Sequence, residues 1–160
     1  MGDIQLSILV MTPGNNPYLE QCLKSFDSLR KAIPSELIVV DTGCNTMDRK
    51  LVDCYADRVV EFSWCDDFAA ARNAGLEVCC GEWLLYLDDD EYLVDVAALV
   101  AFFGSDDVKD TVYATFPLRN YMDDTLRDYR KGAVSRLYRM DGDTRFIYRI
   151  HEAIPVVEAP

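Results

Sequence analysis

The sequence predicts an α/β fold with a central, mostly parallel sheet flanked by helices. Short apolar runs alternate with segments in which apolar residues recur every three or four positions, a pattern typical of β-α-β units. With 160 residues, half of them hydrophobic, the chain is long enough to bury a sizeable core as a single domain. We therefore expect one domain over residues 1–160.

Four buried strands are predicted in the first half, because four apolar runs each end in turn-forming or acidic residues. These runs cover residues 4–11, 37–40, 58–62 and 83–87. Helical spacing predicts one helix between Pro17 and Pro34, a second over 47–55 and a third over 68–78. Asp66 or Asp67 is expected to cap the third helix.

The second half changes character and predicts a small antiparallel element. A helix is expected over residues 94–103, followed by strands over 111–117 and 133–140. Asp141-Gly142 predicts a tight turn into a further strand over 145–150. The polar residues 120–131 between the first two strands predict an exposed loop or hairpin.

Charge and composition exclude several classes of partner. The net charge of −12 and pI of about 4.4 argue against a nucleic-acid backbone or an anionic membrane as the main partner. No apolar stretch approaches the roughly 18 residues of a membrane span, and no secretory leader is visible. The six cysteines lack zinc-site spacing, so we expect reduced, partly buried thiols in a cytoplasmic protein.

The most informative segment is the run Trp83-Leu84-Leu85-Tyr86-Leu87-Asp88-Asp89-Asp90-Glu91, in which a buried strand ends in four carboxylates. Close like charges repel, and a hard divalent cation such as Mg²⁺ or Mn²⁺ is the simplest means of holding them together. Ligands of open α/β sheets bind beyond the carboxyl ends of the strands. The run therefore predicts a metal site for a phosphate-bearing substrate, with a solvated acidic turn as the alternative.

Three other positions are candidates for chemistry. Asp41, at a strand end, is placed to bind a ribose or base, or else to form the following turn. Arg72 can reach a diphosphate with its bidentate guanidinium, or else pair with Asp66 or Asp67. In the pair His151-Glu152, the histidine can complete a metal site and the glutamate can act as a general base.

Four segments resemble, in order and spacing, those of the family 2 glycosyltransferases, which have the GT-A fold. A fifth, Arg149-Ile150-His151-Glu152, resembles an element in a bacterial subgroup of that family. The likeness extends from about residue 5 to residue 154. The four segments are residues 7–11, 36–43, 66–73 and 83–91.

This resemblance implies a nucleotide-diphospho-sugar donor, a divalent cation and inversion at the anomeric carbon. Asp88 and Asp90 match the ends of the family's Asp-x-Asp motif. Asp90 is then the direct metal ligand, and Asp88 contacts the metal, its bound water or the ribose. Asp89 joins the donor site, and His151 is a further candidate ligand.

Within the domain we expect a nucleotide-binding half over residues 1–92 and an acceptor-side half over 93–160. Because the chain stops soon after the His151-Glu152 pair, we also expect further sequence in a longer parent protein. Thr12, Asp41 and Arg72 match positions around the donor, for which a UDP-sugar is favoured. The acceptor is expected to be a glycan, a lipid-linked molecule or a protein. An inverting transfer needs a carboxylate base, and the candidates are Asp123, Asp124 and Glu152.

Some features depart from this family. Residues 12–16 differ from the usual Lys-Asn-Glu loop, and the Gln-x-x-Arg-Trp element of processive synthases is missing. A haloacid-dehalogenase-type phosphotransferase also has an Asp-x-Asp after a strand. There the motif follows the first strand and is followed by a threonine, where this chain has Tyr92. A non-catalytic module that binds nucleotide sugars is the remaining alternative.

Overall fold

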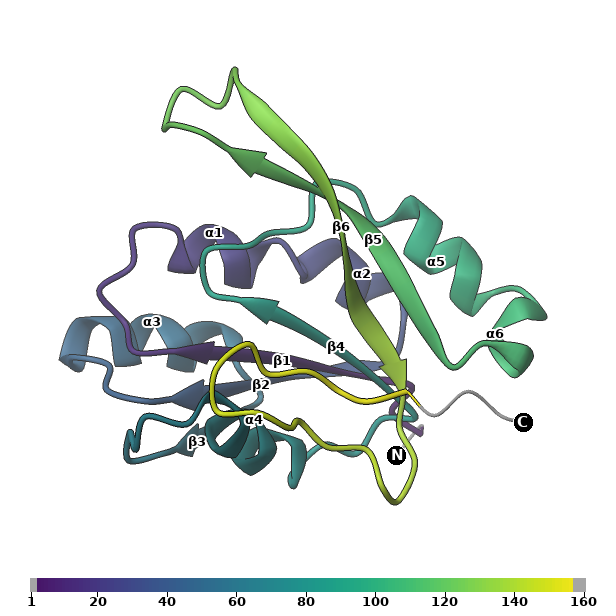
Figure 1. Ribbon diagram of the computed structural model, residues 1–160, viewed down its shortest axis with the longest axis horizontal. Helices are drawn as coiled ribbons and strands as arrows, with labels where there is room; N and C mark the ends of the chain where they lie inside the picture. The colour runs from purple at the N-terminus through teal and green to yellow at the C-terminus, as the bar shows by residue number, and fades with distance from the viewer. Residues whose placement is uncertain (1–2, 157–160) are drawn as a thin grey trace.

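The computed structural model, which describes residues 3–156, is built around a six-stranded sheet in the order β3-β2-β1-β4-β6-β5 (Figure 1). Strands β1 to β4 are parallel, β6 runs antiparallel to β4, and β5 runs antiparallel to β6. This confirms the predicted mostly parallel sheet with an antiparallel addition. The strands are β1 Leu6–Thr12, β2 Ser35–Asp41, β3 Arg58–Glu61, β4 Trp83–Asp88, β5 Tyr113–Tyr121 and β6 Tyr129–Arg139.

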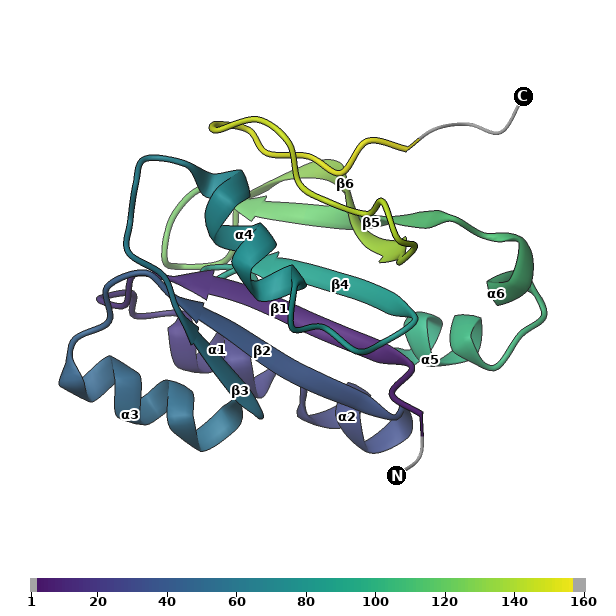
Figure 2. The ribbon, with the colours of Figure 1, turned by 90° about the horizontal axis from the view of Figure 1, so that it is seen from below.

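Helices cover both faces of the sheet (Figure 2). The side chains of α1, α2, α3 and α5 pack on one face, whereas α4 and the chain after β6 cover the other. Every residue of β1 is buried, as expected for a central parallel strand. Among residues 3–156, none of the helices has the length and apolarity of a membrane span. The helices are α1 Leu19–Lys24, α2 Asp27–Ala32, α3 Thr46–Tyr55, α4 Phe68–Leu76, α5 Ala97–Phe103 and α6 Asp107–Asp110.

The helix predicted between Pro17 and Pro34 is divided into α1 and α2, so that prediction was wrong in detail. The hydroxyl of Ser25 donates to the carbonyl of Cys22 at 2.7 Å and accepts from the amide of Leu93 at 3.1 Å. A serine hydroxyl competes in this way with the helical ladder. By accepting from Leu93, Ser25 also links the end of α1 to the segment that follows the four carboxylates of residues 88–91.

The strand predicted over residues 145–150 is absent from the structure. Only an isolated bridge joins Ile147 to Ala153. Tyr148 and His151 have φ values of +72° and +55°, which a strand does not accommodate. The segment is instead an irregular loop that lies against α4, where the amide of Phe68 donates to the carbonyl of Arg149 at 3.0 Å.

The polar stretch predicted over residues 120–131 forms the outer end of a long hairpin that extends past the rest of the sheet (Figure 1). Strands β5 and β6 pair as far as Tyr121 and Tyr129, whose rings lie 5.7 Å apart. The guanidinium of Arg119 lies 5.4 Å from the centre of the Tyr129 ring. These contacts explain why a polar sequence continues the strand.

All six cysteines are free thiols, as predicted. Their burial differs from the expectation, because only Cys22 is buried, whereas Cys44 and Cys79 are half-buried. The three exposed cysteines, for which the prediction of partial burial was wrong, are Cys54, Cys65 and Cys80.

Candidate active site at the carboxyl edge of the sheet

The ends of three adjacent strands lie side by side at one edge of the sheet. Thr12 of β1 pairs with Asp41 of β2, and Met11 of β1 pairs with Asp88 of β4. The chain runs from β1 outward to β2 and β3, and then returns to place β4 on the other side of β1. The gap beyond β1 and β4 is therefore the topological switch point, where α/β sheets bind ligands.

Both carboxylate oxygens of Asp88 accept hydrogen bonds from arginines. The Nη2 of Arg72 donates to Oδ1, and the Nη2 of Arg136 donates to Oδ2 at 2.9 Å. Arg136 also donates to Oε1 of Glu91 at 2.7 Å, while Oε2 of Glu91 accepts from the amide of Asp88 at 3.1 Å. Two of the four strand-end carboxylates are thus neutralised by the protein itself, without a metal ion.

Asp89 is held toward β1. The buried hydroxyl of Thr12 donates to Oδ2 of Asp89 at 2.6 Å and accepts from the amide of Gly14 at 2.9 Å. Gly14 has a φ of +74°, and a Cβ at this position would lie 2.6 Å from Oδ2 of Asp48. Glycine therefore lets the loop after β1 turn close to the strand ends.

Among residues 3–156, Asp89 and Asp90 have no arginine or lysine partner, and Asp90 also lacks a side-chain donor such as the Thr12 hydroxyl that binds Asp89. The pKa of Asp90 is raised, first because the surrounding protein partly desolvates it and then because Asp88 and Asp89 are negative neighbours. A cation beside it would relieve both effects. The open carboxylate of Asp90, with Asp88 next to it, is the oxygen donor set that Mg²⁺ or Mn²⁺ prefers.

The predicted set of Asp88, Asp90 and His151 is not assembled as a cage. In the part of the chain that the structure describes, no three His, Cys, Asp or Glu side chains converge on a position for a metal. His151 lies in the exposed loop after Phe146. Mg²⁺ is commonly held by one or two carboxylates together with substrate phosphates, so the open carboxylate of Asp90 fits such an ion, whereas both oxygens of Asp88 accept from arginines.

Arg72 is one of the most deeply buried side chains in the protein, with 1% exposure. Its Nε donates to Oε1 of Glu152 at 2.7 Å, and its guanidinium lies 5.0 Å from the centre of the Tyr86 ring. The predicted alternative, a surface pair with Asp66 or Asp67, is not observed. Asp67 instead caps α4 by accepting from the amide of Ala70 at 2.9 Å, which confirms the predicted cap.

Arg136 was missed by the sequence analysis. It lies in β6 beside Leu137, which pairs with Leu85 of β4, and its guanidinium lies 4.8 Å from the Tyr86 ring centre. No motif marks Arg136, because β6 also contains Arg130 and Arg139. The register of β6 against β4 places Arg139 opposite Trp83, at the start of β4, and Arg136 beside Tyr86, near its acidic end.

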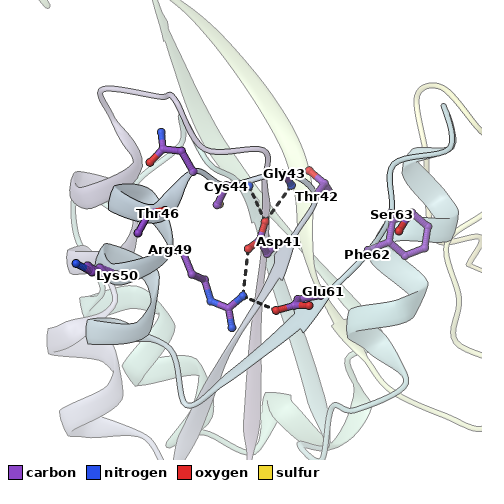
Figure 3. Close-up of a pocket in the computed structure, with 11 residues that line it drawn as sticks. Asp41, Thr42, Gly43, Cys44, Thr46, Arg49, Lys50, Glu61, Phe62 and Ser63 are labelled. Atoms are coloured by element: carbon purple, nitrogen blue, oxygen red, sulfur yellow. Dashed lines mark hydrogen bonds and ion pairs between the residues drawn. The ribbon is translucent and has the colours of Figure 1, made fainter.

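Asp41 borders an open pocket of about 770 Å³ between the turn after β2, helix α3 and the end of β3 (Figure 3). Its Oδ1 accepts from the amides of Gly43 at 2.9 Å and Cys44 at 2.7 Å, and its Oδ2 lies 3.3 Å from Nη1 of Arg49. Burial alone would raise the pKa of Asp41, but these donors lower it overall. Arg49 also pairs with Glu61 at 2.8 Å, so the pocket holds both signs of charge.

The three candidate bases occupy different surroundings. Asp123 accepts from the amide and hydroxyl of Thr125 at 2.9 and 2.6 Å, and these bonds lower its pKa. Asp124, also in the hairpin turn, accepts from the hydroxyl of Tyr18 through Oδ1. Its Oδ2 accepts no hydrogen bond from residues 3–156. Glu152 is bound to Arg72, and its side chain is 14% exposed.

The open α/β sheet and the polar side chains at its switch point are together typical of domains that bind a ligand at the carboxyl edge of the sheet.

The chain belongs to glycosyl transferase family 2, whose family model matches residues 7–155. A TPR repeat-containing protein of Synechococcus elongatus is 30% identical over 150 residues, 94% of this chain and 35% of that protein. The SPbeta prophage-derived glycosyltransferase SunS of Bacillus subtilis is 24% identical over 144 residues, 84% of this chain and 31% of that protein. The chain thus spans about a third of the length of these relatives.

Solved structures confirm the predicted GT-A-like fold. S. aureus TarS 1–349 has a TM-score of 0.60 at 17% identity, over 90% of this chain and 50% of that one. The same protein in complex with UDP-GlcNAc has a TM-score of 0.57 at 20% identity, over 74% and 35%. The mannosyltransferase PcManGT of Pyrobaculum calidifontis, in complex with GDP-Man and Mn²⁺, has a TM-score of 0.51 at 23% identity, over 60% and 30%.

Proposed function

We propose that this chain is a metal-dependent glycosyltransferase domain that moves a sugar from a nucleotide-diphosphate donor to an acceptor hydroxyl, with inversion. One observation carries the proposal: a pocket beside Asp41 and an acidic turn at Asp88–Asp90 flank the end of β1, at the switch point of the sheet. This spacing suits a ligand with a base and ribose at one end and a diphosphate at the other. The family 2 match and the UDP-GlcNAc complex of TarS favour a UDP-sugar.

The nucleoside binds in the Asp41 pocket in this proposal. The carboxylate of Asp41 already accepts from two backbone amides and lies near Arg49, so it is held ionised and fixed in orientation. An ionised, oriented carboxylate is a strong acceptor for a ribose hydroxyl or for the N–H of uracil. Thr12 does not bind the nucleotide directly, since its hydroxyl is engaged with Asp89 and Gly14.

Asp90, with Asp88 beside it, would hold a Mg²⁺ or Mn²⁺ ion. The bound ion supplies positive charge that neutralises the departing nucleoside diphosphate. The Mn²⁺ complex of the mannosyltransferase PcManGT supports this choice of ion. Arg72, which the sequence analysis placed on the diphosphate, is buried between Asp88 and Glu152, so we assign it the task of fixing these two carboxylates.

Asp124 is the proposed catalytic base. The hydrogen bonds from Thr125 lower the pKa of Asp123 below its usual value and so weaken it as a base, and Glu152 is committed to the buried Arg72. Each aspartate keeps one oxygen without a hydrogen bond from residues 3–156, but only Asp124 is anchored by Tyr18 to the loop that follows β1. In a single displacement, Asp124 takes the proton of the acceptor hydroxyl as that oxygen attacks the anomeric carbon, while the diphosphate leaves from the opposite face. The acceptor is the hydroxyl of a glycan, a lipid-linked molecule or a protein.

Calorimetric titration of UDP, with and without Mn²⁺, tests the donor site. We expect Mn²⁺-dependent binding to the wild type and its loss in Asp90→Ala. Asp110→Ala, which removes an exposed carboxylate in α6, is the matched control and should bind as the wild type does. Unchanged UDP affinity in Asp90→Ala would contradict the metal site, and no binding to any variant would exclude UDP. Release of UDP from UDP-GlcNAc then separates a transferase from a module that only binds.

A further inference from the structure

Arg136 is embedded in the acidic edge although it belongs to a different part of the chain. Its side chain is 14% exposed, and its Nη2 lies 2.9 Å from Oδ2 of Asp88 and 2.7 Å from Oε1 of Glu91. Two carboxylates therefore share one guanidinium nitrogen. The Nε of Arg136 is buried and has no hydrogen-bond partner among residues 3–156, so the side chain is held by its charge pairs and by the ring of Tyr86.

This arrangement places a fixed positive charge where a divalent ion is expected to bind. With Arg72 on its Oδ1 and Arg136 on its Oδ2, Asp88 has both oxygens engaged. A divalent ion that uses Asp88 has to compete with these arginines and is repelled by their charge. A nucleoside diphosphate brings negative charge and oxygen ligands of its own. The divalent ion is therefore expected to bind more tightly when the diphosphate is present.

We propose that Arg136 is a positioning residue that acts as an internal countercation for Asp88 and Glu91. It keeps both carboxylates in place in the ion-free protein and weakens the binding of a free divalent ion. The ion is then bound firmly only together with the diphosphate of the donor. The proposal rests on the metal- and nucleotide-dependent function proposed above and adds to it a coupling between the two ligands.

The test measures Mn²⁺ binding by calorimetry, first to the protein alone and then in the presence of UDP. Removing the charge in Arg136→Met should make the binding of Mn²⁺ alone about tenfold tighter, since one unit of nearby positive charge is lost at a partly solvated site. The gain in Mn²⁺ affinity caused by UDP should shrink in this variant. Arg136→Lys, which retains the charge, should restore most of the wild-type coupling.

Arg139→Met is the matched control. Arg139 is on the same strand and lies 5.2 Å from the Trp83 ring centre, so its removal also takes a guanidinium from an aromatic contact. It makes no ion pair with Asp88 or Glu91 and should leave Mn²⁺ binding unchanged. If Arg136→Met does not fold, as judged by circular dichroism, Arg136→Gln removes the charge while keeping a polar side chain.

The outcomes separate the two proposals. Mn²⁺ affinity in the charge-free variant that is no higher than in the wild type would overturn the role of Arg136. Tighter binding in the control Arg139→Met as well would overturn it too, because the effect would then follow from net charge alone. If UDP binds to no variant, the nucleotide function fails, and the comparison with Mn²⁺ alone still decides the role of Arg136.

Discussion

The Nε of Arg72 lies 2.7 Å from Oε1 of Glu152, although the two residues are eighty positions apart in the sequence. The same guanidinium donates to Asp88 through Nη2. Helix α4, the end of strand β4 and the segment near the end of the described chain therefore meet at one buried cation. Arg72 therefore holds the end of β4, where the acidic turn begins, against α4 and the segment around Glu152.

Arg72→Met is expected to destabilise the protein strongly. The substitution removes the shared partner of two carboxylates, one of them only 14% exposed, and breaking a buried pair costs about 3 kcal/mol. The free energy of unfolding from urea denaturation measures the loss. Arg149→Met is the control, because Arg149 is 73% exposed and lies 3.4 Å from its partner Asp67. Equal losses in the two variants would show that burial of the Arg72 pairs does not matter.

Thr12→Val is expected to cost about 2 kcal/mol, since it leaves a half-buried carboxylate oxygen and a buried amide without partners at nearly constant volume. The groups affected are Oδ2 of Asp89 and the amide of Gly14. Thr12→Ser keeps the hydroxyl and should lose much less stability. Urea denaturation of the three proteins checks this, and a Val variant as stable as the Ser variant would argue against the role of the hydroxyl.

Much of the parallel half of the fold was predictable from the sequence. Four apolar runs end in turn formers, and in parallel sheets such ends meet at one edge. By that rule Asp41 and Asp88, which both follow buried strands, are expected at one edge, and the structure places them there on either side of the end of β1. The hairpin was predicted less well, because the alternation in β5 and β6 includes polar and charged residues whose pairing depends on cross-strand contacts such as Arg119 with Tyr129.

The chemistry of the acidic turn was only partly predictable. The expectation that four adjacent carboxylates require a metal ion overlooked countercharges from distant segments. Arg136 carries no local signal of its role, and it reaches Asp88 only because β6 joins the sheet beside β4. Asp90, which lacks such a pair within the described residues, is where the sequence-based expectation of a metal ligand still stands as a proposal.

Asp41 should contribute to the acid sensitivity of the fold. Because its folded-state pKa is lowered from the usual 3.8, its ionised form stabilises the protein above about pH 4, and this contribution is lost as the pH falls through the folded-state value. Asp41→Asn should therefore cost about 1 kcal/mol at pH 7 and progressively less toward pH 3. Urea denaturation across this range tests it, with Asp110→Asn as an exposed control. If the loss of unfolding free energy in Asp41→Asn does not vary with pH, it comes from the changed side-chain structure and not from the lost charge.

Replacing the candidate bases one at a time should identify the residue that accepts the acceptor proton. Asp124→Asn keeps the size of the side chain and an acceptor for Tyr18, so the fold and UDP binding should persist. The turnover number should fall by about a hundredfold or more, as expected when a general base is lost.

Asp123→Asn, from the same turn, is the matched control and should retain turnover within a few-fold. Glu152→Gln should instead lower stability through Arg72. A collapse of turnover in Asp123→Asn or Glu152→Gln, with UDP binding and stability intact, would transfer the role of base to that residue.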